Sequence, residues 1–194
     1  MKFTKLAVAV ATFLVAGSVM AGDNYASATF DRKDKQDSTQ VNYVYGLNVG
    51  QKFSDGWAAE VRMEDEKVDP GAAAIQKQEG LVQLKVSKDF ANFGPVTPYV
   101  AGAIGQKNKS TVDFSYYVAE VGAKFKLSDS IGVRYGWRQR VAFDDNATNN
   151  YNTRENALAL AYSPTKHDTV SVAYKQERGT SNYNTTGLYY TRGF

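Results

Sequence analysis

Charged side chains recur along the chain at even spacings. Arg134, Arg138 and Arg140 are separated by four and two residues, and side chains at even spacing lie on the same face of an extended strand. Three guanidinium groups on one face would bind anions, since each offers several hydrogen-bond donors. Glu120 and Glu155 flank this group in sequence and would neutralise it. The pattern therefore predicts either a ladder for anions or a set of internal ion pairs.

Segment 131–143 shows the strand pattern that must position these arginines. Its odd positions are apolar apart from Gln139, and its even positions carry glycine, arginine or alanine. Alternation with a period of two is the signal of a strand. Strands of globular proteins usually run about five or six residues, whereas this one keeps its apolar face for thirteen. Such a length is typical of a strand that crosses a membrane.

Nine further segments repeat the pattern with a turn or a polar loop between them. They are 24–33, 40–53, 57–66, 78–88, 96–106, 112–127, 153–162, 169–178 and 185–194. In 96–106 both faces carry apolar residues, so its lipid-facing phase stays open. The chain therefore predicts ten strands, with eight and twelve as alternatives.

The connections alternate in length. Short turns are predicted at 54–56, 128–130 and 163–168, and longer polar loops at 67–77, 144–152 and 179–184. The connection 89–95 is an exception, because it falls at the end of the short turns but is longer than they are. This alternation indicates an all-β fold, an antiparallel up-and-down transmembrane β-barrel with both ends of the chain at the periplasmic side.

The charged faces must then point inward, because the outside of such a barrel meets hydrocarbon. A soluble barrel, the alternative, would have the opposite polarity. The predicted lumen is mixed in charge with a small basic excess. Its basic residues are Arg62, Lys85, Lys124, Arg134, Arg138, Arg140 and Lys175, and its acidic residues are Glu60, Glu64, Glu120, Glu155 and Glu177.

The chain begins like a secreted protein. Lys2 and Lys5 precede an apolar run at 6–16, and Val19-Met20-Ala21 has the small-residue spacing of a cleavage site. We expect residues 1–21 to be a cleaved signal peptide and 22–194 a single barrel domain. Without Lys2 and Lys5 the basic and acidic residues nearly balance, so the charge implies no nucleic-acid partner.

The chain has few residues of the types that catalysis or metal binding requires. There is no cysteine and one histidine, His167, which lies in a predicted periplasmic turn. We therefore expect a protein that is not an enzyme and needs no cofactor or metal. Two acidic clusters lack the fixed ligand spacing of a calcium loop and are interpreted as paired or solvated charges: Glu60, Glu64, Asp65 and Glu66, and Asp144-Asp145-Asn146.

The chain resembles bacterial outer-membrane β-barrel proteins. Segment 97–105 is similar to the PYVGAG-type strand of the small outer-membrane barrels, and Leu188, Tyr190 and Phe194 resemble the alternating carboxy-terminal assembly signal. Arg192 departs from that signal, which favours an apolar residue there. The resemblance implies location in the cell outer membrane, contact with its lipid, and recognition by the barrel-insertion machinery. A weaker likeness is to small porins for acidic oligosaccharides, which usually have twelve strands.

Two functions remain open. Ten strands lie near the size at which side chains fill a barrel, which favours an ion-paired lumen and a structural or surface-interaction role. In that case outer loops such as 146–153, rich in Asn, Thr and Tyr, would contact an extracellular ligand. Inward glycines and alanines leave room for water and favour the alternative, a narrow porin-like channel that prefers anions.

Overall fold

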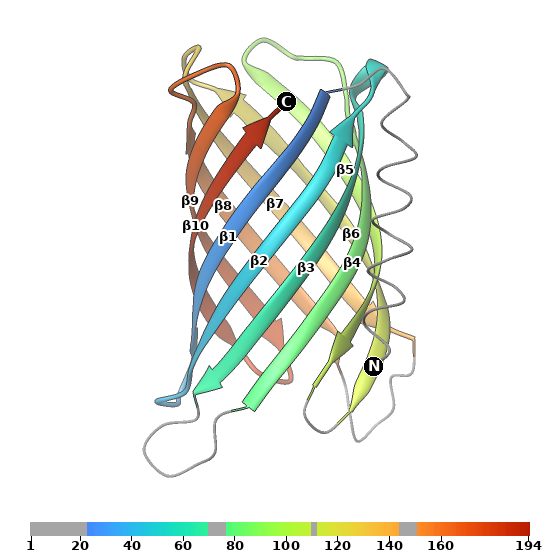
Figure 1. Cartoon of the computed structure of the whole chain (residues 1–194), viewed down its shortest axis with the longest axis vertical. Helices are drawn as coiled ribbons and strands as arrows, with labels where there is room; N and C mark the ends of the chain where they lie inside the picture. Colours follow the sequence, from blue (N-terminus) through green and yellow to red (C-terminus); the bar gives the residue numbers. More distant parts are fainter. Residues whose placement is uncertain (1–22, 70–76, 110–111, 144–150) are drawn as a thin grey trace.

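A closed barrel of ten antiparallel strands forms the whole described structure (Figure 1). The computed structural model describes residues 23–69, 77–109, 112–143 and 151–194. The predicted signal peptide and Asp144-Asp145-Asn146 lie outside them. The strands are β1 (Asp23–Lys35), β2 (Val41–Lys52), β3 (Trp57–Asp69), β4 (Lys77–Asp89), β5 (Val96–Asn108), β6 (Asp113–Lys126), β7 (Ile131–Ala142), β8 (Thr153–Tyr162), β9 (Asp168–Gly179) and β10 (Tyr183–Gly193).

Each strand pairs with its neighbours in sequence, and β1 pairs with β10 to close the barrel. The predicted fold and the count of ten strands are confirmed. The predicted boundary at Lys67 is wrong, because β3 continues to Asp69 and pairs there with Val41 of β2. Ladder hydrogen bonds continue beyond the belt in which lipid imposes alternation, so the pattern ends before the strand does.

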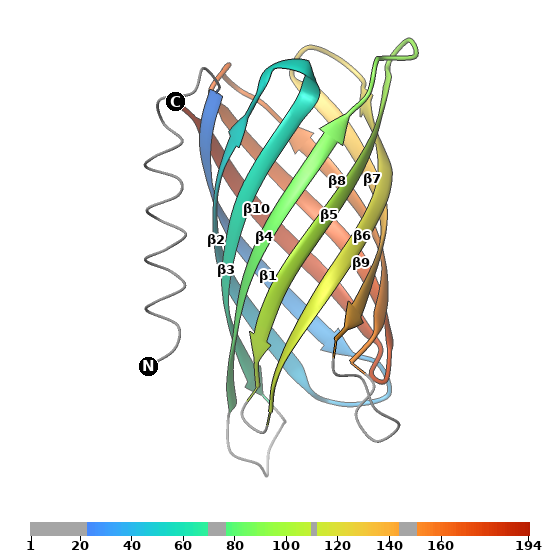
Figure 2. The same ribbon diagram turned by 90° about the vertical axis from the view of Figure 1, so that its right-hand side faces the viewer.

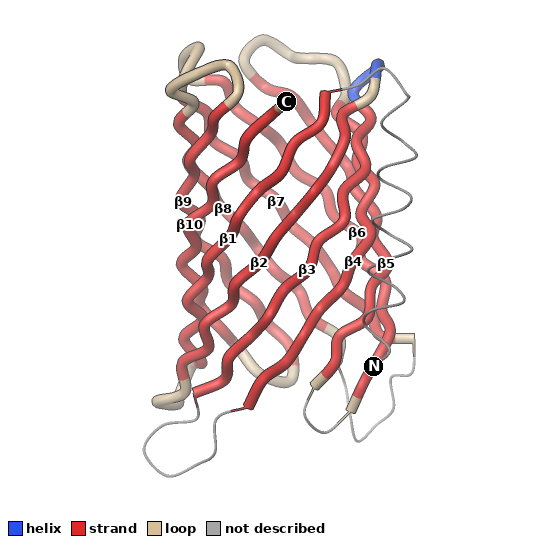
Figure 3. The backbone as a smooth tube through the Cα atoms, viewed as in Figure 1, coloured by secondary structure: helices blue, strands red, loops and turns tan. Residues whose placement is uncertain are grey.

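The turns predicted at 54–56, 128–130 and 163–168 lie at one end of the barrel, beside the start of β1 and the C-terminus (Figures 1 and 3). We call this the periplasmic end and the opposite one the outer end. At the outer end the loop predicted to be long at 179–184 is a short turn, because β9 continues to Gly179 and β10 begins at Tyr183. The β2–β3 connection is a single 3-10 turn, η1 (Ser54–Gly56), in which Asp55 and Gly56 have φ angles of 63° and 77°. At the seam Phe194 donates its backbone N–H to the carbonyl of Asn24 at 2.9 Å.

The outer wall is apolar. Leu158, Val172 and Leu188, on three successive strands, are each 52% exposed. On β5 the phase that the sequence left open is settled, since Val100 and Ile104 are exposed outside while Tyr99 is 2% exposed and lies inside. Leucine and valine so exposed in a row are what hydrocarbon requires of a membrane barrel. Figure 2 shows the barrel from the side of β4–β6.

The assembly-signal residues lie on this wall. Leu188 and Tyr190 are exposed on the outer face of β10, and Phe194, the residue after it, is exposed as well. Arg192, which departs from the signal, lies 3.6 Å from the carboxylate of Asp168 on the neighbouring strand. No helix among the described residues is long and apolar enough to cross a membrane.

A charge at Val172 tests the lipid-facing phase. Val172→Arg places a guanidinium in hydrocarbon and should lower the free energy of unfolding by about 2–4 kcal/mol. Gln176→Arg, on the same face of β9 but nearer the outer interface, should cost about 0–1 kcal/mol. Urea titration in lipid vesicles measures both. Equal costs would contradict the assignment of this face to lipid.

Candidate functional site

The barrel interior is lined by charged side chains. The twelve predicted lumen residues all share the inward phase of their strands. Six charged residues join them that the sequence interpretation missed. They are Asp31, Lys33, Glu66, Glu79, Asp89 and Lys107.

A cluster of six charges fills the interior near the outer end, and we call it the outer cluster. The Nζ of Lys107 lies 2.6 Å from Glu66 and 3.1 Å from Glu79. Lys33 lies 3.4 Å from Glu66, whose Oε1 also accepts a hydrogen bond from Asn42 at 2.6 Å. Two more pairs complete the outer cluster at 4.0 Å, Lys33–Glu177 and Arg140–Glu177.

Aromatic rings close the space beside the outer cluster. Tyr116 is 0% exposed and Phe114 3%. The guanidinium of Arg140 lies over both rings, 5.5 Å and 5.8 Å from their centroids. Tyr151 stacks on Phe114 at 4.4 Å. The outer half of the described barrel is therefore filled with paired charges and packed rings.

Midway along the barrel the charges form separate pairs. Lys175 on β9 contacts Asp31 on β1 at 2.6 Å, and Tyr189 donates to the same carboxylate at 2.5 Å. Arg62 pairs with Glu64 on its own strand, and Arg138 lies 3.7 Å from Glu155.

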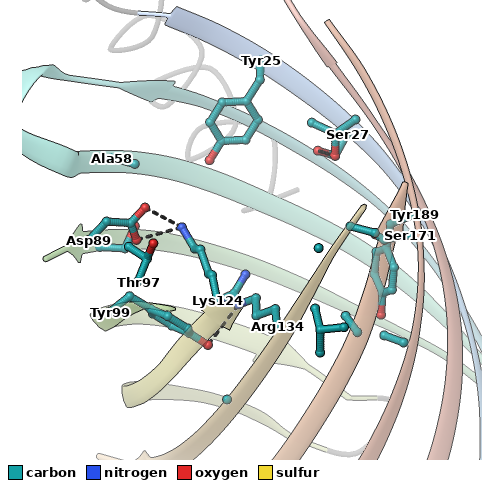
Figure 4. Close-up of a pocket in the computed structure, with 18 of the residues that line it drawn as sticks. Tyr25, Ser27, Ala58, Asp89, Thr97, Tyr99, Lys124, Arg134, Ser171 and Tyr189 are labelled. Carbon is teal, nitrogen blue, oxygen red and sulfur yellow. Dashed lines mark hydrogen bonds and ion pairs between the residues drawn. The ribbon is translucent and has the colours of Figure 1, made fainter. Parts of the chain in front are cut away.

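Glu120 organises the periplasmic half. It accepts hydrogen bonds from Lys85 at 2.8 Å, from the Tyr99 hydroxyl at 2.9 Å and from Arg134 at 2.6 Å. Arg134 also donates to the Tyr99 hydroxyl at 3.0 Å, and its guanidinium lies 4.4 Å from that ring centroid. Figure 4 shows this contact beside the pair formed by Lys124 and Asp89, 2.5 Å apart.

Glu120 and Glu155 were predicted to neutralise the three arginines of β7. The structure differs from this prediction at one arginine. Glu120 contacts Arg134, and Glu155 lies nearest Arg138. Arg140 instead approaches Glu177. The cause is register, because Arg140 aligns with uncharged Thr153 on β8, and the acid it reaches lies one strand further.

Tyrosines occupy space that inward glycines leave. A Cβ at Gly50 would lie 2.5 Å from the Tyr25 ring, and one at Gly122 would lie 2.6 Å from the Tyr99 ring. The Tyr99 hydroxyl also lies against Gly136. At these positions the room that glycine provides holds an aromatic ring, so the channel interpretation loses part of its support.

A chamber of about 870 Å³ remains in the periplasmic half. Turn residues such as Gly56 and Ser128 lie at its mouth, and Arg62, Arg138 and Lys175 line its deeper part. One wall is made of small side chains, Ala157, Ala159, Ala161 and Ala173. None of the outer-cluster residues lines it. Among the described residues, the chamber thus opens at the periplasmic end and stops below the outer cluster.

Two buried polar atoms belong to residues that line this chamber. They are the Nε of Arg138 and the Oδ1 of Asn48, and neither has a hydrogen-bond partner among the described residues. Buried polar groups are nearly always paired with protein or water. These atoms are therefore the points at which the chamber would hold water or a polar solute.

The residues considered for metal or catalysis lie apart. His167 is in the β8–β9 turn at the periplasmic end, where its carbonyl accepts from Gly193. Asp65 faces outward and accepts from Gln78, while Glu66 on the inner face is paired with lysines. Among the described residues no group of three or more His, Asp or Glu is placed to hold a metal ion.

Gly136→Ala tests the packing of Tyr99. The new methyl would meet the Tyr99 hydroxyl and displace it from Glu120 and Arg134, so the free energy of unfolding should fall by roughly 1–3 kcal/mol. Gly132→Ala, on the same face of β7, meets nothing closer than 3.4 Å and should change it by about 0.5 kcal/mol or less. Urea unfolding in lipid vesicles compares the two. Equal stability would mean that Tyr99 is not held in place.

Comparisons with known proteins agree with this architecture. No protein-family model matches the chain, and no curated protein matches it in sequence. An outer-membrane channel from Pseudomonas putida F1 aligns with a TM-score of 0.60 and 10% identity, over 91% of this chain and 96% of that one. The NanC porin aligns at 0.55 and 11%, over 85% and 98%. The translocator domain of the autotransporter NalP from Neisseria meningitidis aligns at 0.54 and 9%, over 100% and 98%.

Because these sequence identities are low, the matches show a shared fold and nothing more. They include channels and a translocator, which share one architecture. The apolar outer wall and the closed antiparallel barrel meet the same requirement of a lipid environment. The chain has the fold of the bacterial outer-membrane β-barrel proteins, in agreement with its predicted location in the cell outer membrane.

Proposed function

We propose that this protein is a non-enzymatic outer-membrane barrel with a closed lumen, acting in a structural or surface-interaction role. The observation that carries the proposal is the outer cluster, in which Glu66 and Lys107 are 5% and 7% exposed and lie 2.6 Å apart. A path for solute through the barrel would have to pass these side chains.

Opening such a path is energetically unfavourable. Removing one partner of a buried ion pair typically costs about 3–5 kcal/mol, because the other charge is left uncompensated. In the outer cluster Glu66 contacts Lys33 and Lys107 together, and Lys107 also contacts Glu79. Displacing Lys107 would therefore break two contacts at once, which supports a lumen that stays closed.

A surface role places the contacts with other molecules at the outer loops. The loop proposed for this purpose, 146–153, is described from Tyr151 onward. Tyr151 stacks on Phe114, and the Asn152 side chain accepts from the Ala142 backbone N–H at 3.0 Å. These two residues anchor the end of the loop to the barrel. Residues 146–150 lie outside the described part of the chain.

The alternative function is a narrow channel that prefers anions. It is favoured by the periplasmic chamber and by Arg138, whose Nε lacks a hydrogen-bond partner among the described residues. Two of the solved structures with this fold are a porin and a channel. In this alternative the outer cluster would have to rearrange to let solute through.

Single-channel recording in planar bilayers separates the two functions. We expect no steady conductance from the native barrel, and conductance from Lys107→Ser/Glu66→Ser, which removes both partners of the pair and shortens both side chains. Arg134→Ser/Glu120→Ser is the matched control, because it widens the chamber below the outer cluster and should stay silent. The shift in electrophoretic mobility on heating verifies that each variant folds. Steady anion-selective conductance from the native protein would contradict closure and favour the channel.

A further inference from the structure

Two arginines lie side by side on the outer wall near the outer end. Arg154 on β8 and Arg178 on β9 are directly opposite in the antiparallel register, and Gln139 on β7 is the next residue in the same row. All three occupy the outward phase of their strands, the phase of Leu158 and Tyr174. The row therefore faces the membrane and not the lumen.

Like charges directly opposite each other on neighbouring strands destabilise a sheet unless something compensates them. The other outward arginines have such compensation, since Arg32 pairs with Asp34 at 2.9 Å and Arg192 lies near Asp168. Neither Arg154 nor Arg178 makes an ion pair with any residue that the structure describes. Among the residues that the structure describes, this pair is thus a double positive charge without an acidic partner.

The geometry holds one of the two guanidinium groups in place. Arg178 donates through one nitrogen to the carbonyls of Glu177 and Tyr183, at 2.9 Å and 3.2 Å. Arg154 is exposed on the neighbouring strand β8. The hollow around them has a volume of about 540 Å³. Its lining consists of Gln139, Asn152, Thr153, Arg154, Arg178, Gly179 and Thr180.

The height of the row matches the headgroup layer. Tyr162 lies at the periplasmic end of β8, eight residues from Arg154. At about 3.3 Å per residue and a tilt of about 40°, this separation is roughly 20 Å along the membrane normal. The apolar band of such barrels is about 25 Å tall, so the long side chain of Arg154 reaches its outer edge.

We propose that Arg154 and Arg178 form a binding site for the phosphorylated headgroup of an outer-leaflet lipid. A phosphate oxygen pair accepts from guanidinium groups in a bidentate manner, and its charge removes the repulsion between the two arginines. The apolar wall below the row, with Leu158 and Tyr174, would take up the acyl chains of the same lipid. The amide of Gln139 offers a further donor.

Native mass spectrometry of the protein extracted from vesicles tests this site. The vesicles contain phosphatidylcholine with either diphosphorylated lipid A or its dephosphorylated form. We expect the native protein to retain diphosphorylated lipid A, and Arg154→Gln/Arg178→Gln to lose about tenfold or more of that retention. Arg32→Gln is the matched control, because it removes an outward arginine that already has an acidic partner. It should retain lipid like the native protein.

Other outcomes would overturn the proposal. Equal retention of the phosphorylated and dephosphorylated lipids would mean that the acyl chains alone bind. Inorganic phosphate that displaces the lipid completely at millimolar concentration would indicate a free-anion site. The variant Arg154→Lys/Arg178→Lys keeps the charge and should recover only part of the retention, since lysine cannot bind phosphate in a bidentate manner. Full recovery would contradict the bidentate geometry.

Discussion

A charge inside a membrane barrel must have a partner, and this constraint shapes the interior of the molecule. The outside is apolar because it faces hydrocarbon, so charged side chains on these strands can point only inward. There most carboxylates lie against lysine or arginine, as Glu66 does with Lys33 and Lys107 and as Glu120 does with Lys85 and Arg134. Most of these pairs join strands that lie two apart around the barrel, so they link strands that share no ladder hydrogen bonds.

The same pairs divide the interior into two parts with different consequences. Near the outer end, paired charges and the rings of Phe114 and Tyr116 fill the cross-section. Near the periplasmic end, the alanine wall on β8 and β9 leaves a chamber that Arg134 and Lys124 border with charge. A filled outer half fits the proposed closed barrel that presents loops to the exterior, and the open half supports the alternative of a channel.

Much of this architecture is predictable from the sequence, because lipid imposes a strict alternation. The alternation along β7 is enough to place Arg134, Arg138 and Arg140 on the inner face. The partners were harder to predict, since Lys107–Glu66 and Lys175–Asp31 join distant parts of the chain and depend on the register of two successive strand pairings. Lys107 was also missed because β5 continues beyond its apolar pattern, and Tyr99 because both faces of that strand are apolar.

A double-mutant cycle on Lys107 and Glu66 tests most directly whether buried pairing closes the barrel. Lys107→Met, Glu66→Gln and the double variant would be unfolded in urea in lipid vesicles, with the exposed pair Arg32–Asp34 as reference. If the pair holds the outer half closed, its coupling energy should be about 2–3 kcal/mol, against about 0.2–1 kcal/mol for the exposed pair. Equal coupling in the two cycles would contradict the central role of the outer cluster.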